Sequence, residues 1–277
     1  MAYTGGETVT LNAGQTLEGP STIANTNLTG QDAYARILYA SNATLGTVSV
    51  SSGGQLYLRG DDATAEQLYV YGPYTINKTA VEASGGRLFI SGGKVDELTL
   101  DNEGLAWMYG GEVTNLLLSK TNTALTSSVK LRIYGGTVMG GSNAGNAGAK
   151  EIYAWGGVVS NFTMNANAYI FASNGGYFKD CTFSGVWFAI RGGTAEKVTI
   201  LNAGANSNNR MSTGLMSDCT IAAGASYTAI GGKAIGTVVS GANARFRVSG
   251  AAAVMEGGTV LSGSSTFSTA VVLGNRL

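Results

Sequence analysis

The sequence predicts an all-β chain folded as a right-handed parallel β-helix, a β-solenoid, with roughly 11–14 rungs of about 19–20 residues. A phrase recurs in which apolar residues alternate, two glycines follow, and a second alternation begins, as in Leu88–Leu100 and Ala106–Leu118. A period of about 20 residues with period-2 alternation inside it is typical of a β-solenoid. The tighter six-residue period of left-handed hexapeptide helices is not present.

Composition agrees with a folded repeat protein. Glycine supplies 42 of the 277 residues, proline only 2, and charged residues 12%. Low charge can accompany disorder, but 44% of the residues are hydrophobic and the strand formers are regularly spaced. The chain has no apolar run near the ~20 residues of a membrane helix, and we expect no membrane insertion by this segment. Its beginning also lacks the pattern of a signal peptide.

The repeat suggests one continuous domain over 1–277, because each rung of a solenoid packs on its neighbours. We expect amino-terminal cap rungs over 1–35, a repeat body over 36–262, and a carboxy-terminal cap strand over 263–277. Longer spacings between rungs predict an insertion near 71–83, which contains Gly72-Pro73, and a loop over 140–149.

Numbering each rung from the first glycine of its pair, or its equivalent, predicts which residues face the core. Positions minus four and minus two are almost entirely apolar, from Leu38 and Ala40 to Phe246 and Val248, with Phe171 and Ser173 in the seventh rung. Positions plus six and plus eight form a second inward pair of columns, which ends at Cys219 and Ile221. Rungs stack about 4.8 Å apart, so the apolar side chains of each column pack on their equivalents in the next rung and fill the interior.

The two cysteines fall in the same inward column. Cys181 and Cys219 are separated there by Val198, so they are expected two rungs, or about 9–10 Å, apart. A disulfide needs Cα atoms within roughly 7 Å. We therefore expect two small, buried, free thiols.

Outward positions minus three and minus one carry aromatic and arginine side chains over three consecutive rungs. The residues of this candidate binding face are Trp107, Tyr109, Arg132, Tyr134, Tyr153 and Trp155. Flat aromatic rings stack on sugars or form protein contacts, and Trp, Tyr and Arg dominate binding hot spots. Two alternatives stay open: a ladder of rings that only stabilises the sheet, or a face covered by the 140–149 loop.

The polar residues at position plus five are the main candidates for catalysis. Asp180 and Asp218 would lie about 9–10 Å apart, near the upper separation of an inverting carboxylate pair. Lys197 stands between them, so an alternating, solvated charge ladder is the simpler interpretation. Asp61-Asp62 similarly reads as a solvated turn rather than a Ca²⁺ site. We expect neither a metal nor a cofactor.

The missing residue types exclude several function classes. The chain has no histidine, which removes histidine bases, triads and ordinary zinc sites. Its formal net charge is zero, and no basic tract predicts nucleic-acid binding.

Segments such as Gly92–Leu100 and Gly231–Val239 resemble the AIDA-type repeats of bacterial autotransporter adhesin passengers, which pair glycines and repeat Val and Thr. The resemblance covers about Tyr39 to Leu261. It implies a secreted or surface-displayed bacterial β-helix involved in adhesion or self-association, but the degenerate motif carries over no binding residue.

The function expected from the sequence is therefore a non-enzymatic, secreted or cell-surface module. Its partners would be further copies of itself or a cell-surface glycan or protein. The alternatives are a β-helix that binds or cleaves an acidic polysaccharide, as lyase or glycosidase, and a purely structural stalk segment.

Overall fold

A computed structural model describes strand backbones between Thr8 and Leu273 and side chains over 88–102, 104–120, 128–144, 149–165, 168–202 and 209–261. Contacts divide the chain into two compact units, Met1–Glu151 and Ile152–Leu277. The described residues form strands and turns without a helix, so none of them belongs to a helix that could cross a membrane.

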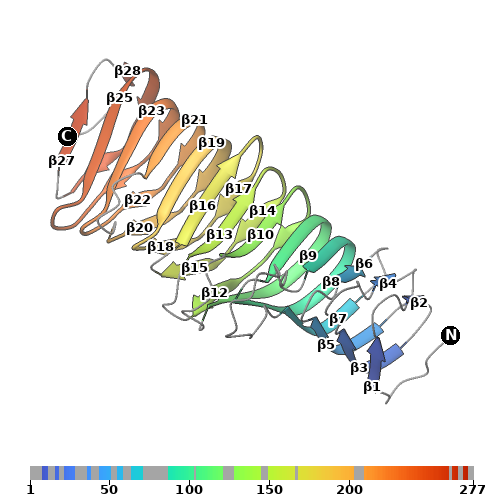
Figure 1. The fold of residues 1–277 in the computed structure, drawn as a ribbon. Helices are drawn as coiled ribbons and strands as arrows, with labels where there is room; N and C mark the ends of the chain where they lie inside the picture. Colours follow the sequence, from blue (N-terminus) through green and yellow to red (C-terminus); the bar gives the residue numbers. More distant parts are fainter. Residues whose placement is uncertain are drawn as a thin grey trace, which may run out of the picture. The chain divides into compact units, whose positions relative to one another are not determined.

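The strands are short, except where two alternations run together through a glycine pair (Figure 1). The amino-terminal unit contains β1 (Thr8–Leu11), β2 (Thr16–Glu18), β3 (Thr22–Leu28), β4 (Arg36–Leu38), β5 (Thr44–Val50), β6 (Gln55–Leu58), β7 (Thr64–Val70), β8 (Arg87–Asp101), β9 (Leu105–Ser119), β10 (Val129–Ile133), β11 (Thr137–Val138) and β12 (Gly141–Ala144). The boundary between the units falls inside β13 (Lys150–Ala154).

The carboxy-terminal unit continues the same pattern. Its strands are β14 (Val158–Ser160), β15 (Phe162–Asn165), β16 (Ala168–Ser173), β17 (Tyr177–Lys179), β18 (Thr182–Ser184), β19 (Trp187–Glu196), β20 (Thr199–Leu201), β21 (Arg210–Ser217), β22 (Thr220–Ile221), β23 (Ser226–Ile235), β24 (Val238–Val239), β25 (Arg245–Glu256), β26 (Thr259–Val260), β27 (Ser264–Phe267) and β28 (Val271–Leu273).

These strands pair in parallel with equivalents one rung away, which confirms the predicted β-solenoid. Each rung contributes to three ladders: one before the glycine pair, a second just after it, and a third at the second apolar alternation. The third ladder runs through β1, β3, β5, β7, β8, β9 and β12 in the first unit. In the second unit it runs through β15, β18, β20, β22, β24 and β26. The right-handed winding of the solenoid stays a prediction.

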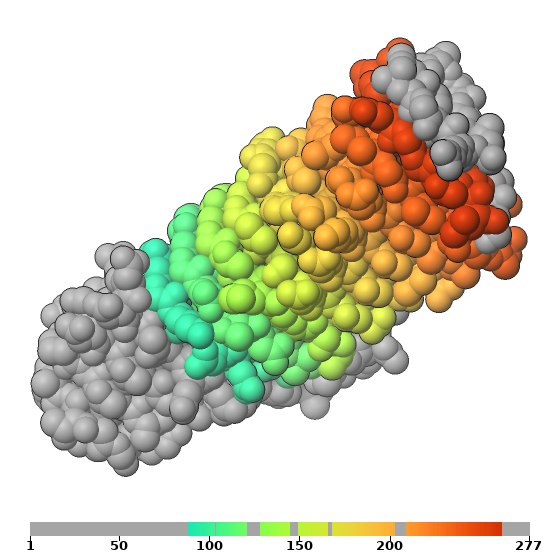
Figure 2. Space-filling model, turned by 180° about the vertical axis from the view of Figure 1, so that it is seen from behind, coloured from blue at the N-terminus to red at the C-terminus, as the bar shows by residue number. Residues whose placement is uncertain are grey.

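The core consists of the inward columns that the sequence predicts, together with one that it did not reveal. Leu88, Ile90, Leu98 and Leu100 are at most 1% exposed, and their equivalents in later rungs are similarly buried. A further buried column at position plus three belongs to the second ladder. Its members are Val95, Val113, Val138, Val159, Phe178, Ala195, Met216 and Ala234. In Figure 2 the described side chains of each unit follow one another as bands in chain order.

The predicted register is wrong in the seventh rung. Ile170 and Ala172 point inward and pair with Phe188 and Ile190, whereas Phe171 was expected in the inward column and Ala172 outward. The cause is an irregularity at Ser173, which pairs with both Arg191 and Gly192. One extra residue at such a bulge shifts every preceding side chain to the opposite face.

Of three further predicted features, one can be placed in part and two cannot be placed. The insertion near 71–83 and the Asp61-Asp62 pair lie outside the described residues. The first half of the expected 140–149 loop is instead the strand β12, which pairs with Leu116–Ser119 of β9. Residues 141–144 therefore continue the third ladder, while Trp107 belongs to the first ladder. The remaining residues, 145–148, lie outside the description.

Candidate interaction surface

Strands β8, β9 and β10 bring three outward side chains into register in the first ladder. Phe89 pairs with Trp107, and Trp107 pairs with Arg132. Side chains alternate across each strand, so the apolar neighbours of these residues enter the core while these three point away from it. The predicted candidates Trp107 and Arg132 are therefore direct neighbours.

Trp107 has both faces of its indole occupied. The Phe89 ring from the preceding rung stacks on it with centroids 4.6 Å apart and planes 5° from parallel. From the following rung, the guanidinium carbon of Arg132 lies 6.0 Å from the Trp107 ring centroid, a cation–π arrangement. Only the edge of this ring remains for a partner.

Tyr109 and Tyr134 are the most accessible of the predicted residues. Their rings stack with centroids 5.1 Å apart and planes 8° from parallel, and the side chains are 53% and 44% exposed. In the preceding rung, β8 pairs Ile90 with Met108 and Ser91 with Gly110, so an irregularity leaves Tyr109 without a paired residue there. The pair thus presents two partly exposed phenol rings with their hydroxyl groups.

Tyr153 and Trp155 belong to a second aromatic cluster, in the carboxy-terminal unit. Tyr153 stacks on Trp155 at 5.3 Å and on Phe171 at 4.6 Å. Phe171 also meets Trp187, whose ring is tilted at 5.8 Å, and the guanidinium carbon of Arg191 at 5.1 Å. These residues are buried or half-buried, except for Arg191, which is exposed.

The sequence-derived face missed several members of this cluster, namely Tyr169, Phe171, Trp187 and Arg191. Phe171 was assigned to the core by the one-residue register error. Tyr169 and Trp187 pair with each other, and each lies two residues before the residue of its own strand that belongs to the outward column. Extending the alignment by one more alternation would have found them.

The column expected to be a solvated charge ladder forms a corner of the backbone. Asn161, Asp180, Lys197 and Asp218 have φ angles of 50–52°, in the left-handed region. Their N–H groups donate to carbonyl oxygens of the next rung, from Asn161 to Lys179 (3.1 Å) through to Asp218 to Ile235 (2.9 Å). Asn, Asp and Gly tolerate this conformation best, which explains the polar column without catalysis.

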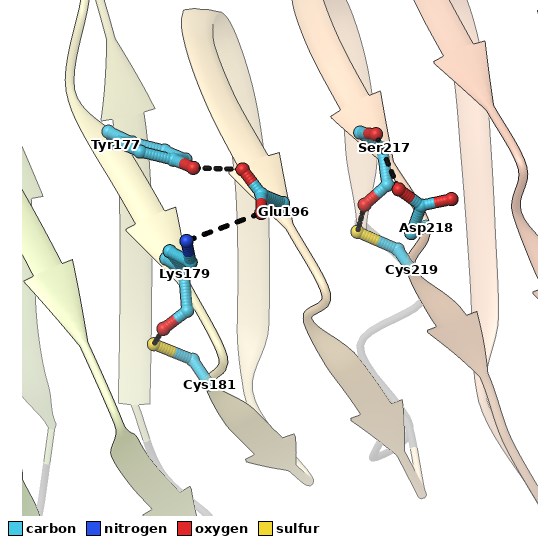
Figure 3. A network of polar contacts seen from close by, with 7 residues as sticks. All are labelled: Tyr177, Lys179, Cys181, Glu196, Ser217, Asp218 and Cys219. Atoms are coloured by element: carbon cyan, nitrogen blue, oxygen red, sulfur yellow. Dashed lines mark hydrogen bonds and ion pairs between the residues drawn. The ribbon is translucent and has the colours of Figure 1, made fainter.

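A polar network connects two rungs on the outer side of the second ladder (Figure 3). The Tyr177 hydroxyl donates a hydrogen bond to Glu196, and Lys179 Nζ lies 3.5 Å from Glu196 Oε1. The hydrogen bond from Tyr177, more than the lysine charge, lowers the pKa of Glu196, and the same bond raises the pKa of Tyr177 to about 12. Glu196 is thus held ionised and Tyr177 neutral, which suits neither a general acid nor a general base at neutral pH.

Both cysteines are buried and free, as expected. The pairings of Thr182 with Thr199 and of Thr199 with Thr220 place Val198 between Cys181 and Cys219. Their thiols donate to backbone carbonyls, from Cys181 to Lys179 (3.2 Å) and from Cys219 to Ser217 (3.3 Å) (Figure 3). Burial raises the pKa of Cys181 to about 11 and of Cys219 to about 12.

Among the residues with described side chains, no three His, Cys, Asp or Glu side chains come together in a group that could hold a metal ion. The polar side chains that interact, such as Tyr177, Lys179 and Glu196, form hydrogen bonds and ion pairs between neighbouring rungs. Among the six residues of the candidate binding face, Tyr109 and Tyr134 are the two large side chains that remain exposed to a partner.

Comparison with known proteins gives one structural likeness. No protein-family model matches the chain, and no curated protein matches it. Among solved structures, the crystal structure of a TibC-catalysed, hyper-glycosylated fragment of TibA, residues 55–350, is similar. It is 19% identical, with 99% of each chain covered and a TM-score of 0.48.

Proposed function

We propose that this protein is a non-enzymatic adhesion module that acts by surface contact, first of all with further copies of itself. The observation that carries the proposal is the stacked, exposed Tyr109–Tyr134 pair on the outer side of the first ladder. Tyrosine supplies a large, rigid contact area at low entropic cost and is enriched at binding hot spots. The resemblance of the glycine-pair rungs to AIDA-type repeats supports secretion or display on a bacterial surface.

The remaining predicted residues support this pair in different ways. Trp107 is held between Phe89 and Arg132, so it positions the outer surface more than it contacts a partner. Tyr153 and Trp155 stack within the second cluster and present a surface in the other unit. A cell-surface glycan that packs on the exposed part of the Tyr109 ring is the second partner this geometry admits.

Sedimentation velocity on the wild type and on a Tyr109→Ser/Tyr134→Ser variant tests the proposal. We expect the variant to self-associate at least about tenfold more weakly, with a melting temperature within a few degrees of the wild type. A Thr114→Ala/Asn115→Ala variant, which changes exposed residues of the same strand, should associate normally.

Three results would contradict the proposal. Unchanged association in the tyrosine variant would remove the pair from any interface. A large fall in its melting temperature would make the rings a structural ladder, as in a stalk. Release of reducing sugar or unsaturated products from an acidic polysaccharide would instead favour the enzyme alternative.

A further inference from the structure

The zero net charge of the chain conceals two oppositely charged units. Residues 1–151 contain 9 Lys and Arg against 13 Asp and Glu, a net charge of −4. Residues 152–277 contain 8 Lys and Arg against 4 Asp and Glu, a net charge of +4. The carboxy-terminal unit is therefore basic, which the total does not reveal.

The acids of the basic unit lie away from the first ladder. Glu196 is bound by Tyr177 and Lys179, and Glu256 lies 2.5 Å from Lys233, both in the second ladder. Asp180 and Asp218 occupy the corner column on either side of Lys197. The lysines of this unit are thus placed among its carboxylates.

Arginines are the only charged residues of the first ladder in this unit, within the described segments of β16, β19, β21, β23 and β25. They are Arg191, Arg210, Arg245 and Arg247. Arg210 is half-buried, the other three are exposed, and none forms an ion pair with a described carboxylate. We call these four side chains the arginine face.

The arginine face has the regular spacing of the solenoid. Arg210 pairs with Thr228, which pairs with Arg247, so these two arginines occupy one outward column about 10 Å apart. Arg245 is two residues before Arg247 on the same side of β25, about 7 Å away. Such positions suit a ligand that carries acid groups at intervals along an extended chain.

We propose that the arginine face binds a polysaccharide that carries carboxylate groups. The planar guanidinium fork donates two parallel hydrogen bonds to a carboxylate, which a lysine ammonium does not. The nearby rings are already engaged, since Phe171 stacks on Tyr153 and is covered by Arg191. They therefore offer poor platforms for the base stacking that supports binding of single-stranded nucleic acid. The site is separate from the Tyr109–Tyr134 pair and does not depend on its function.

Binding of polygalacturonate to the full chain, measured by calorimetry at low and at high salt, tests the assignment. We expect binding at low salt that weakens as salt rises, with no binding of neutral dextran of the same length. An Arg210→Gln/Arg247→Gln variant should bind at least about tenfold more weakly. A Lys179→Gln/Lys233→Gln variant loses the same charge from the second ladder and should bind like the wild type.

An Arg210→Lys/Arg247→Lys variant keeps the two positive charges but removes the planar guanidinium groups, so it shows how much of the binding needs the guanidinium geometry. Binding intermediate between the wild type and the glutamine variant is expected, with an unchanged melting temperature as the check on folding. Equal losses in the arginine and lysine glutamine variants would overturn the proposal, because net charge alone would then explain binding. It would also be overturned if a 30-nucleotide oligo-dT bound more tightly than polygalacturonate, or if the arginine variant lost only salt-sensitive self-association.

Discussion

At the residue scale, the fate of each aromatic ring depends on which of its faces the neighbouring rungs cover. Trp107 lies between Phe89 and Arg132, whereas Tyr109 has a stacked ring on the Tyr134 side and is 53% exposed. Sequence position alone treats these residues as equivalent, because both point outward on one strand. The two rings differ in how much of their surface is covered because different residues lie next to them in the neighbouring rungs.

The buried thiols predict how stability changes at alkaline pH. Cys181 and Cys219 ionise near pH 9.0 when unfolded, but burial raises the folded pKa to about 11 and about 12. Above pH 9 the folded state therefore holds more protons than the unfolded state, and its stability falls as pH rises. We expect the free energy of unfolding to fall by about 1.4 kcal/mol per pH unit for each thiol, up to its folded pKa.

Urea denaturation at several pH values between 8 and 11 measures this slope. A Cys181→Val/Cys219→Val variant restores the residue type of Val198 in the same column, and it should lose that part of the slope. Lys150, whose pKa burial lowers, contributes equally to both proteins and cancels in the comparison. Parallel curves for the two proteins would contradict the burial of these thiols.

At the element scale, the corners depend on close backbone approach as well as on conformation. Gly136 has a φ of 85°, and a Cβ added there would lie 2.6 Å from the carbonyl oxygen of Gly111. At Gly175 the φ is 110°, but nothing lies within 4 Å of the added atom. Both positions carry backbone strain for an alanine, and only Gly136 adds a backbone clash.

We therefore expect Gly136→Ala to destabilise the fold more than Gly175→Ala. The second variant should cost about 1–2 kcal/mol, the usual penalty of left-handed backbone for an L-residue, and the first several kcal/mol, because a backbone atom must move. Chemical denaturation compares them directly. Equal losses would mean that the stacked corners yield easily to the added methyl group.

Strand β20 tests the inward and outward register with adjacent residues. Ile200 is 1% exposed, and Thr199 next to it faces outward. Ile200→Asp would bury an unpaired carboxylate and should cost about 4 kcal/mol, whereas Thr199→Asp should change stability by less than about 1 kcal/mol. Similar melting shifts would contradict the register of this ladder.

The inward columns were predictable because they follow strict alternation. Leu88, Ile90, Leu98 and Leu100 occupy two such runs, and their burial matches the sequence pattern. The second ladder escaped notice because Val95 and its equivalents stand alone between the glycine corner and the next corner. A single apolar residue has no period to reveal it.

A further error comes from backbone geometry. The bulge at Ser173 shifts Phe171 outward, and no residue type marks a bulge in this rung unambiguously. Asp180, Lys197 and Asp218 are exposed, as a solvated charge ladder requires, but the sequence did not reveal that left-handed φ angles also select this column. Lys197 concealed this pattern, because lysine seldom occupies such a corner.

At the scale of the whole molecule, the separation of charge has a simple chromatographic signature. A chain of zero net charge whose units carry −4 and +4 should be retained at low salt by both anion and cation exchangers. The Arg210→Gln/Arg247→Gln variant should elute earlier from the cation exchanger than Lys179→Gln/Lys233→Gln, although the net charges match. Passage of the wild type through both resins would contradict this segregation.

The candidate surface was only partly accessible from the sequence. All six predicted residues lie on first-ladder strands or at their ends, as expected, but alignment could not tell which rings would cover one another. The arginine face went unrecognised because Arg191, Arg210, Arg245 and Arg247 are scattered over 57 positions of the chain. Only the stacking of β19, β21 and β25 through β23 assembles them.

The repeated corner has a genetic consequence. Asp180 and Lys197 share a conformation and the same hydrogen bond to the rung that follows. Recombination between their codons would therefore delete or duplicate one complete coil, residues 181–197, and leave the flanking coils with compatible partners. A gene of this kind can change length in whole coils, so its descendants can gain or lose arginines and aromatic rings in blocks without a new fold.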